Sequence, residues 1–332
     1  MKVGVLGLGY WGPNLVRNFL GHTEVEAVIG CDVKEERRDF IKSRFPSVEV
    51  ISDYSELLNQ VDIVAIATPV DMHYKFGKMA LEAGKHIWVE KPFTASSKEA
   101  EELIEIAEQK NVRIFVDHTF IYTGAVQKIK SLIDADELGD IKYFDSVRIN
   151  LGLFQHDINV IWDLAPHDLS IMYHVLGNKK VSAVTANGVA NYYDYENIAQ
   201  LCVYFEDNCF ANFHVNWTSP VKIRRMLLGG NKKMLVFDDM ENIEKIKVYD
   251  SGVEMNTTES IHEALVQYRI GDMHSPKVNQ TEALALGVKE FISSINEGRS
   301  PLTSGKDGLD VVKILEASEF SIKNKGQLVE IT

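Results

Sequence analysis

Hydrophobic residues in the first third of the chain gather in short runs that alternate with longer amphipathic stretches. The short runs are typical of buried strands and are Lys2–Leu6, Val25–Cys31, Val48–Ile51, Asp62–Ala67, His86–Val89 and Arg113–Val116. The stretches between them have helical spacing and are Pro13–Leu20, Lys34–Phe45, Tyr54–Asn59, Asp71–Glu82 and Ser97–Lys110. Strands separated by helical crossovers predict a parallel, doubly wound sheet of the α/β class.

The pattern changes near Tyr122. We first expect a helix at Gly124–Ala135, a strand at Ile141–Leu151 and a helix at Val160–Leu176. Successive strands follow, at Val181–Ala190, Ile198–Phe205, Cys209–Trp217, Lys222–Leu228 and Met234–Asp238. Two helices, Gln280–Asn296 and Gly305–Lys323, close the chain. Successive strands without crossover helices predict a large, mostly antiparallel sheet. We therefore expect two domains, residues 1–121 and 122–332, which suits a chain of 332 residues.

Charge and composition exclude several classes of partner. A formal net charge of -13 disfavours nucleic acid and anionic lipid. No run approaches the roughly 20 apolar residues of a membrane span, and Val3–Leu8 is not a secretory signal. The three cysteines lack metal-ligand spacing and do not suggest a disulfide framework. We expect a cytoplasmic protein that binds neither nucleic acid nor a membrane and holds no metal.

A glycine-rich motif, Gly7-Leu8-Gly9-Tyr10-Trp11-Gly12, follows the first expected strand and opens the first expected helix. Gly7 permits a tight turn, Gly9 lets a pyrophosphate approach the backbone, and Gly12 permits close packing of helix on strand. The N-terminus of the helix offers N–H groups and a positive dipole end to phosphates. The motif and its context predict a dinucleotide-binding Rossmann domain, with Gly7, Gly9, Tyr10, Trp11 and Gly12 at the cofactor.

Asp32 ends the second expected strand, 20 residues after Gly12. A carboxylate at that place accepts hydrogen bonds from the adenosine ribose hydroxyls and repels a 2′-phosphate, so NAD is favoured over NADP. Arg37 and Arg38 lie nearby and favour NADP to a lesser degree. The alternative interpretation is a glycine turn followed by an aspartate that caps a helix.

Chemically useful side chains follow the fourth and fifth expected strands. Thr68-Pro69 ends the fourth strand, His73 lies just beyond, and Glu90-Lys91-Pro92 ends the fifth. In an open parallel sheet, ligands bind beyond the carboxyl ends of the strands. Lys91 can take the hydroxyl proton as hydride leaves, provided that burial or a cation lowers its pKa from about 10.4. The alternative is a surface lysine paired with Glu90.

A second cluster lies in Asn159–Asp168. Asp163 and His167 are four residues apart, so on a helix they share one face, where a carboxylate orients an imidazole and raises its proton affinity. Pro166 leaves open a helix that begins there, with Asp163 on the entry loop. The alternative is a helix-capping Asp163 and a structural His167.

At these residues the chain resembles the Gfo/Idh/MocA oxidoreductase family, named for glucose–fructose oxidoreductase and inositol dehydrogenase. The resemblance covers essentially the whole chain and rests on the glycine motif, Thr68-Pro69 with His73, Glu90-Lys91-Pro92, and Asp163 with His167. The Glu-Lys-Pro step is the most specific of these. One segment, Asp117-His118-Thr119, departs from the commoner Asn/Arg-containing pattern at the end of the sixth strand.

The resemblance implies a Rossmann domain followed by an α/β domain whose large, mostly antiparallel sheet joins subunits into a homodimer or homotetramer. It implies that Lys91 relays the proton, that His167 is a second acid/base or orienting group, and that Asp163 is the acidic residue one turn before it. It implies contacts of Thr68, Pro69, His73, Glu90 and Lys91 with NAD, and an NAD(P)-dependent dehydrogenase acting on CH–OH groups.

The substrates that the resemblance implies are sugars, cyclitols and sugar nucleotides. The C-terminal half looks most like members that act on nucleotide-activated sugars, because of the cations in Asn216–Arg225 and Tyr268-Arg269. We expect Arg224 and Arg269 to bind a diphosphate beside Lys91, Asp163 and His167. The leading prediction is oxidation of the 3-hydroxyl of a UDP-N-acetylhexosamine, and a merely solvated face is the alternative reading of these cations.

Two other functions stay open. One is a glycosidase that keeps NAD bound and oxidises its substrate transiently in a redox-neutral cycle. The other is a non-enzymatic NAD-binding regulator on the same fold. The joint presence of Lys91, Asp163 and His167 argues against a regulator, and turnover assays with added NAD separate the classes.

Overall fold

The structure is a computed structural model that describes residues 1–152, 158–177, 179–192, 194–255 and 266–331. Contacts group the chain into two compact units, Met1–Tyr122 with Thr281–Lys313 and Thr123–Gln280 with Ile314–Thr332. The chain therefore leaves the first unit, returns to it and leaves it again. The division into domains 1–121 and 122–332 stays a prediction. Grouping residues by their contacts identifies compact units and does not test whether each unit folds on its own.

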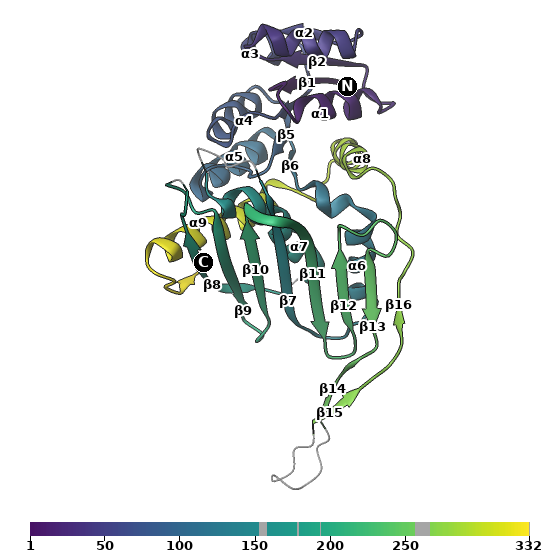
Figure 1. Ribbon diagram of the computed structural model, residues 1–332. Coiled ribbons are helices and arrows are strands. Elements are labelled where there is room, and N and C mark those ends of the chain that lie inside the picture. Colours follow the sequence, from purple (N-terminus) through teal and green to yellow (C-terminus); the bar gives the residue numbers. More distant parts are fainter. Residues whose placement is uncertain (153–157, 178, 193, 256–265, 332) are drawn as a thin grey trace. The chain divides into compact units, whose positions relative to one another are not determined.

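The first unit is built on six parallel strands in the order β3-β2-β1-β4-β5-β6 (Figure 1). They are β1 (Lys2–Leu6), β2 (Ala27–Cys31), β3 (Glu49–Ile51), β4 (Ile63–Ile66), β5 (His86–Glu90) and β6 (Ile114–Asp117). β1 pairs with β2 on one side and with β4 on the other, so the strand order reverses there. Ligands bind beyond such a reversal in open sheets. The prediction of a parallel, doubly wound sheet is confirmed.

Helices connect these strands. They are α1 (Gly12–Leu20), α2 (Glu35–Arg44), α3 (Tyr54–Leu58), α4 (His73–Glu82) and α5 (Ser97–Lys110), with 3₁₀ turns η1 (Val70–Met72) and η2 (Thr119–Tyr122). α1 shows why they form, because Leu15, Val16 and Phe19 recur at helical spacing and are buried in the core. The expected helix Asp71–Glu82 is in fact η1 followed by α4.

A late segment completes the core of the first unit. Helix α8 (Ala283–Asn296) brings Phe291 to 6.0 Å from the Trp88 ring and 5.3 Å from the Phe115 ring, measured between centroids. Beyond α8, the N–H of Val116 in the edge strand β6 donates to the carbonyl of Thr303 at 2.8 Å. Residues 281–313 therefore cover an apolar face and an edge that residues 1–122 alone leave open.

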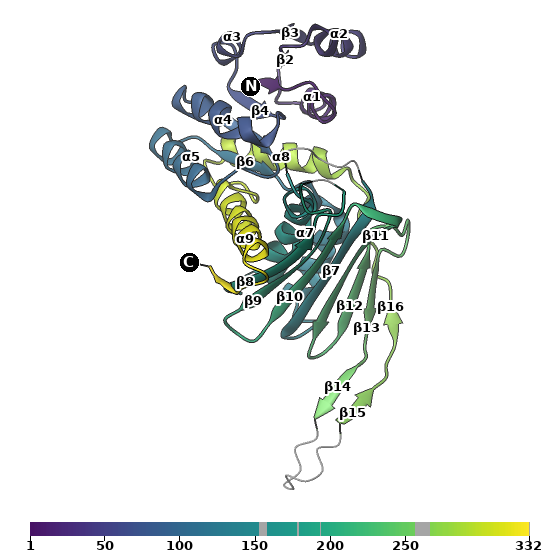
Figure 2. The same cartoon turned by 60° about the vertical axis from the view of Figure 1, so that its left-hand side comes forward.

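The second unit contains a nine-stranded sheet in the order β16-β13-β12-β11-β7-β10-β9-β8-β17 (Figure 2). Its strands are β7 (Ile141–Leu151), β8 (Val181–Val189), β9 (Ile198–Phe205), β10 (Phe210–Asn216), β11 (Thr218–Gly230), β12 (Met234–Asp238), β13 (Ile246–Tyr249), β16 (Met273–His274) and β17 (Val329–Glu330). β7 and β10 pair parallel, and the other paired neighbours are antiparallel. The prediction of a large, mostly antiparallel sheet is confirmed.

Helices α6 (Gly124–Asp134) and α7 (Val160–Leu176) belong to this unit, and α7 packs on β7 and β10. The division between the two units falls inside α9 (Gly305–Lys323). β14 (Gly252–Met255) and β15 (Val266–Arg269) form a separate two-stranded ribbon that projects beyond the sheet in both views (Figures 1 and 2). Among the described residues, no helix is long and apolar enough to span a membrane.

Candidate active site

The glycine motif forms the turn between β1 and α1. Gly7 has φ +91°, and its N–H donates to the carbonyl of Cys31 at 2.9 Å. A Cβ on Gly7 would lie 2.5 Å from the Ala67 carbonyl oxygen, and one on Gly12 would lie 2.2 Å from the Gly7 oxygen. A Cβ on Gly9 would meet no described atom within 4 Å. The fold itself therefore requires Gly7 and Gly12, whereas Gly9 borders open space, and its contact with a dinucleotide phosphate stays a prediction.

The start of α1 suits an anion. Trp11 precedes the helix without a side-chain cap, and the first turn holds no acidic residue, so the positive end of α1 is not neutralised from within the helix. The ring of Tyr10 is 92% exposed and stacks on that of Trp11, with centroids 6.5 Å apart. The Trp11 indole Nε1 donates instead to Oδ2 of Asp117 at 3.3 Å.

Asp32 lies directly after β2 and holds two loops together. Its Oδ2 accepts the Leu8 N–H at 2.8 Å, and its Oδ1 accepts the Lys34 N–H at 2.9 Å. Each carboxylate oxygen keeps capacity for a further donor, such as a ribose hydroxyl. The nearby Arg38 guanidinium donates to the carbonyls of Asp32 and Val33 at 2.8 and 3.0 Å. A backbone role and a ligand role are therefore compatible at Asp32.

His73 connects the segments that follow β4 and β5. Its ring is buried, with Nδ1 2.9 Å from the Pro92 oxygen and Nε2 2.8 Å from the Thr68 oxygen. Burial lowers the pKa of His73, and the two carbonyls partly oppose that shift. The ring thus fixes Thr68-Pro69 against Lys91-Pro92, whose peptide bond is cis. Contacts of Thr68, Pro69 and His73 with a cofactor stay predictions.

Lys91 follows β5 at the carboxyl edge of the sheet and is half-buried. Glu90 and Asp117 end the neighbouring strands β5 and β6 and are opposite each other in register. His118 is buried, and burial with the charge of Lys91 lowers its pKa to about 3, so the imidazole is neutral near pH 7. Four ionisable groups therefore share this strand end.

In the second unit, Asp163 and His167 lie one turn apart on α7. Asn159 caps that helix by accepting the N–H groups of Ile161 and Trp162, each at 3.1 Å. Pro166 lies inside the helix, so the alternative of Asp163 on an entry loop is wrong. The N–H of Asp163 donates to the Asn159 carbonyl at 3.2 Å, as expected for the first turn of an α-helix.

A tryptophan holds the carboxylate of Asp163. The indole Nε1 of Trp217 donates to Asp163 Oδ2 at 3.0 Å, and Trp217 is a buried residue that links β10 to β11 in the sequence. This contact fixes the position of the Asp163 carboxylate. Asp163 is therefore placed to orient a group on the same helix face, as the spacing to His167 predicts.

A buried ion pair lies beside His167. Asp168, the next residue on α7, accepts from Nε of Arg148 at 2.9 Å and from the Ser146 hydroxyl at 2.7 Å. Arg148 and Asp168 are 3% and 1% exposed. The pair fastens α7 to β7, because breaking it would leave a buried charge without a partner.

The expected substrate cations are divided between different surfaces. Arg224 pairs in register with Arg148, so it lies on the sheet face that α7 covers, where Asp239 is 3.6 Å away. The next residue, Arg225, lies on the opposite face and pairs with Asp238. Burial and the charge of Arg148 lower the pKa of Arg224. Arg224, unlike Arg225, thus shares a face of the sheet with the α7 residues.

Arg269 lies at the base of the β14–β15 ribbon. Its guanidinium is 3.0 Å from Asp250 and donates to the carbonyl of Lys232. The side chain of Tyr268 lies outside the described part of the chain. The structure therefore places Arg269 on the ribbon rather than on α7, and its expected contact with substrate stays a prediction.

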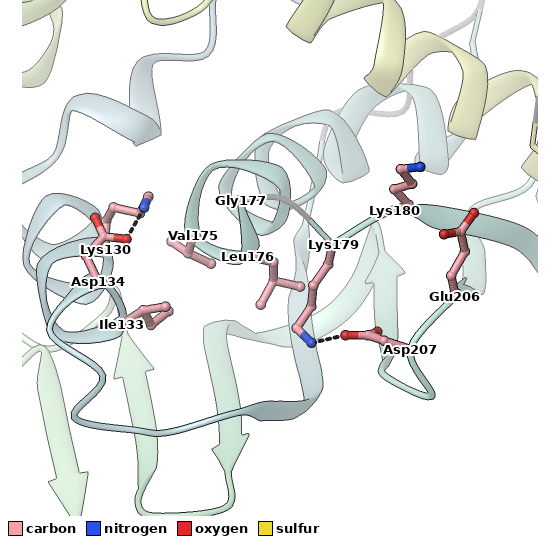
Figure 3. A pocket seen from close by; sticks show the side chains of 10 residues that line it. All are labelled: Lys130, Ile133, Asp134, Val175, Leu176, Gly177, Lys179, Lys180, Glu206 and Asp207. Carbon is pink, nitrogen blue, oxygen red and sulfur yellow. Dashed lines mark hydrogen bonds and ion pairs between the residues drawn. The ribbon is translucent and has the colours of Figure 1, made fainter.

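A pocket of about 540 Å³ lies at the C-terminal end of α7 (Figure 3). Its lining combines charged and apolar residues and consists of Lys130, Ile133, Asp134, Val175, Leu176, Gly177, Lys179, Lys180, Glu206 and Asp207. Two of its lysines already form ion pairs, Lys130 with Asp134 and Lys179 with Asp207. Val175 is twelve residues beyond Asp163, about 18 Å along the helix. This pocket is therefore separate from the predicted site.

The sequence did not predict three residues that contact the candidate site residues or the strand end of Lys91, namely Asp117, Trp217 and Arg148. Arg148 carried a recognisable signal, since it follows Phe144 and Ser146 on the inward face of β7, where a charge needs a buried partner. Asp117 carried only the signal of its place at the end of a parallel strand, and Trp217 carried none, because the partners of both come from elements far away in sequence.

The chain is similar to known oxidoreductases along most of its length. The chain matches the model of an "oxidoreductase family, NAD-binding Rossmann fold" over residues 1–118 and that of a "GFO/IDH/MocA C-terminal domain" over residues 126–236. It is 25% identical to scyllo-inositol 2-dehydrogenase (NADP(+)) of Bacillus subtilis, over 98% of this chain and 94% of that protein. It is 26% identical to UDP-N-acetylglucosamine 3-dehydrogenase of Acidithiobacillus ferrooxidans, over 94% of each.

The fold also matches a solved structure. GenD2 from gentamicin A biosynthesis, in complex with NAD, has a TM-score of 0.84 at 20% identity and covers 100% of this chain and 96% of its own. At that identity the likeness shows that the two proteins share a fold.

Proposed function

This chain belongs to the Gfo/Idh/MocA family of oxidoreductases, and from that premise we propose that it moves a hydride between NAD(H) and a ring carbon of a sugar. The observation that carries the proposal is the meeting, at one edge of the parallel sheet, of the glycine loop and the strand end that bears Lys91. A bare dinucleotide-binding regulator has no need of an amine at that edge.

Proton transfer falls to the chain's own groups. In the oxidation direction the neutral amine of Lys91 takes the hydroxyl proton, and in reduction its ammonium returns it. We assign His167, with Asp163 beside it on α7, as a second group that holds or orients the same hydroxyl. Bound nicotinamide supplies the hydride chemistry, which no protein side chain provides.

NAD is the cofactor we favour. The carboxylate of Asp32 presents negative charge at the end of β2, where a 2′-phosphate would lie. The guanidinium of Arg38 donates to two backbone carbonyls and so offers a 2′-phosphate fewer hydrogen bonds. The similar inositol dehydrogenase of Bacillus subtilis is named for NADP(+), so the preference requires measurement.

A nucleotide-activated sugar is the substrate class we favour, and the 3-hydroxyl of a UDP-N-acetylhexosamine is the leading candidate. Two observations support it. A relative similar over 94% of the chain is named UDP-N-acetylglucosamine 3-dehydrogenase. In addition, Arg224 is a half-buried cation on the face covered by α7, where it offers a diphosphate a charged partner.

The direct test is Lys91→Met in a turnover assay with NAD and a panel of sugars and UDP-sugars. We expect kcat to fall at least ~100-fold, since a general base is lost, while NADH still binds. Lys110→Met is the control, because this exposed lysine lies at the far end of α5 and should leave kcat unchanged.

The same assay separates the rival functions. Near-normal turnover of Lys91→Met would remove Lys91 from the reaction. Sugar release without net formation of NADH would indicate a redox-neutral glycosidase. Binding of NADH without turnover of any substrate would favour a regulator.

A further inference from the structure

Two acidic side chains end neighbouring strands at the carboxyl edge of the parallel sheet, where we propose that the cofactor binds. Glu90 ends β5 and Asp117 ends β6, and the two residues are directly paired in the parallel register. Asp117 is 1% exposed, and Oε1 of Glu90 is shielded from solvent without a hydrogen-bond partner among the described residues. Two carboxylates this close in a dry place cannot both be ionised without a large cost.

The surroundings decide which acid keeps a proton. Burial raises the pKa of Glu90 well above its ordinary value, and the charge of Asp117 and the hydrogen bond between the two carboxyls add to that rise. Burial also raises the pKa of Asp117, but hydrogen bonds from Glu90, Thr119 and Trp11 oppose the shift. Glu90 therefore carries the proton and donates it toward the Asp117 carboxylate.

Asp117 is hydrogen-bonded to the glycine loop through Trp11. Its Oδ1 accepts the Thr119 hydroxyl at 2.5 Å and its Oδ2 accepts the Trp11 indole at 3.3 Å. Trp11 immediately precedes Gly12, the first residue of α1. Because β4 and β5 separate β1 from β6, this indole connects the loop after β1 across two intervening strands. One acid pair thus joins the loop to the strand end of Lys91.

Other charges near the pair are few among the described residues. Lys91 follows Glu90, and its positive charge partly opposes the raised pKa of Glu90. His118 follows Asp117 and is neutral because burial lowers its pKa to about 3. Burial raises the pKa of Tyr122 well above its ordinary value, and the charge of Asp117 adds to that rise, so the phenol stays neutral. Within this cluster, Glu90 is therefore the acid whose charge changes when the shared proton is lost.

We propose that Glu90 and Asp117 act as one acid pair that shares a proton and fixes the glycine loop, through Trp11, relative to the strand that carries Lys91. The three side chains act as positioning residues. Loss of the shared proton places two carboxylates side by side and loosens the loop, so dinucleotide affinity falls as the pH rises. The inference deepens the proposed function and rests on dinucleotide binding at the glycine loop.

The experiment measures the dissociation constants of NADH and NADPH by fluorescence titration between about pH 6 and pH 10 with the whole protein. For the wild type we expect affinity to fall as much as tenfold per pH unit on the alkaline side, the limit for release of one proton. In Glu90→Gln the amide cannot ionise and still donates to Asp117, so we expect the alkaline loss to disappear.

Two further variants identify the titrating group. Lys91→Met removes the other ionisable neighbour and should keep the alkaline loss. Asp310→Asn removes a different acid of the first unit, on α9, whose pKa is also raised by burial, and should keep it too. A direct measurement on the wild type is the infrared band of a protonated carboxyl near pH 7, which should be lost in Glu90→Gln.

The outcomes are distinct. An alkaline loss that persists in Glu90→Gln, a loss abolished by Lys91→Met, or the absence of the carboxyl band would overturn the acid pair and leave the proposed function standing. A wild type whose affinity does not change with pH would do the same. Failure of both dinucleotides to bind at every pH would overturn the acid pair and the proposed function together.

Discussion

At the scale of single residues, Asp32 supports the fold, and we propose that the same carboxylate also binds the ribose of a dinucleotide. It accepts the N–H of Leu8 in the glycine loop and the N–H of Lys34 before α2. Its substitution therefore has two effects, namely a looser loop and the loss of negative charge beside the ribose. The two effects separate when two dinucleotides are compared, since the looser loop affects both and the charge discriminates between them.

Asp32→Ala should weaken NAD binding more than NADP binding. We expect the ratio of the two dissociation constants to shift at least ~10-fold toward NADP, because about 1.4 kcal/mol of repulsion or ribose bonding suffices for that factor. Asp53→Ala is a matched control, since Asp53 also accepts two backbone N–H groups, at the start of α3. An unchanged ratio in Asp32→Ala would remove the ribose contact.

Lys91 and Asp117 show what single residues reveal before a structure is known. The position of Lys91 followed from a local rule, because the residue after a parallel strand lies at the ligand-binding edge. Asp117 also follows that rule, yet its function depends on Glu90 in the adjacent strand and on Trp11 in a distant loop. Local patterns contain no such register, so the acid pair had to come from the three-dimensional arrangement.

At the scale of elements, helix α7 is held by contacts on either side of the turn that carries Asp163 and His167. Asn159 caps its start, and Asp168 joins it to Arg148 of β7 through a buried ion pair. The position of His167, between Asp163 and Asp168, then depends on the attachment of the whole helix to the sheet.

Asp168→Asn should destabilise the second unit strongly. Because Arg148 would keep its charge in a buried place without a carboxylate, we expect a loss of about 3–5 kcal/mol in the free energy of unfolding. Chemical denaturation of the variant and the wild type measures this difference in the free energy of unfolding. Glu244→Gln is the control, since Glu244 forms an exposed pair with Lys247 at 3.7 Å and should cost less than about 1 kcal/mol. Equal losses in the two variants would show that the buried pair is unimportant.

Elements were predictable from the sequence in proportion to their length and periodicity. Helix α7 and strands β7 and β9 have the expected bounds, since long runs of regular spacing leave few alternatives. β11 begins at Thr218, four residues before the expected Lys222, because a register shift between Thr218 and Ile223 interrupts the alternation. Short strands such as β16 and β17 have two residues each and carry no periodic signal.

At the scale of the whole molecule, the open face of the nine-stranded sheet is the surface we propose for contact between subunits. Val147, Leu227 and Val236 lie on the face opposite Arg224 and are half-buried, and Tyr204 and Phe210, a registered pair, are 38% and 41% exposed. Apolar side chains on such a face favour association into a homodimer or homotetramer.

Leu227→Glu should lower the assembly state. A charge in the middle of this face would have to be desolvated in a subunit contact, so native mass spectrometry should show a larger share of monomer than in the wild type. Ile243→Glu is the control, because Ile243 is 84% exposed in the turn between β12 and β13. A wild type that is monomeric at micromolar concentration would contradict the proposed contact.

The composition of the first unit predicts how fragments of the protein behave. A fragment of residues 1–122 lacks Phe291 and the Thr303 carbonyl, which cover Trp88 and the edge of β6. We expect this fragment to bind a hydrophobic dye and to unfold without a cooperative transition. Joining residues 281–313 to it through a flexible linker should restore cooperative unfolding. A cooperative transition in the short fragment would show that the late segment is dispensable.

The return of residues 281–313 to the first unit also determines when that unit can be finished in a living cell. Translation must continue for about 190 residues beyond Tyr122 before Lys313 exists, which takes roughly 10–40 s at the ribosome's roughly 5–20 residues per second. Throughout that interval the nascent chain displays an uncovered aromatic surface and an unpaired strand edge. From the order of residues along this chain we therefore expect its dinucleotide-binding half to bind chaperones during synthesis.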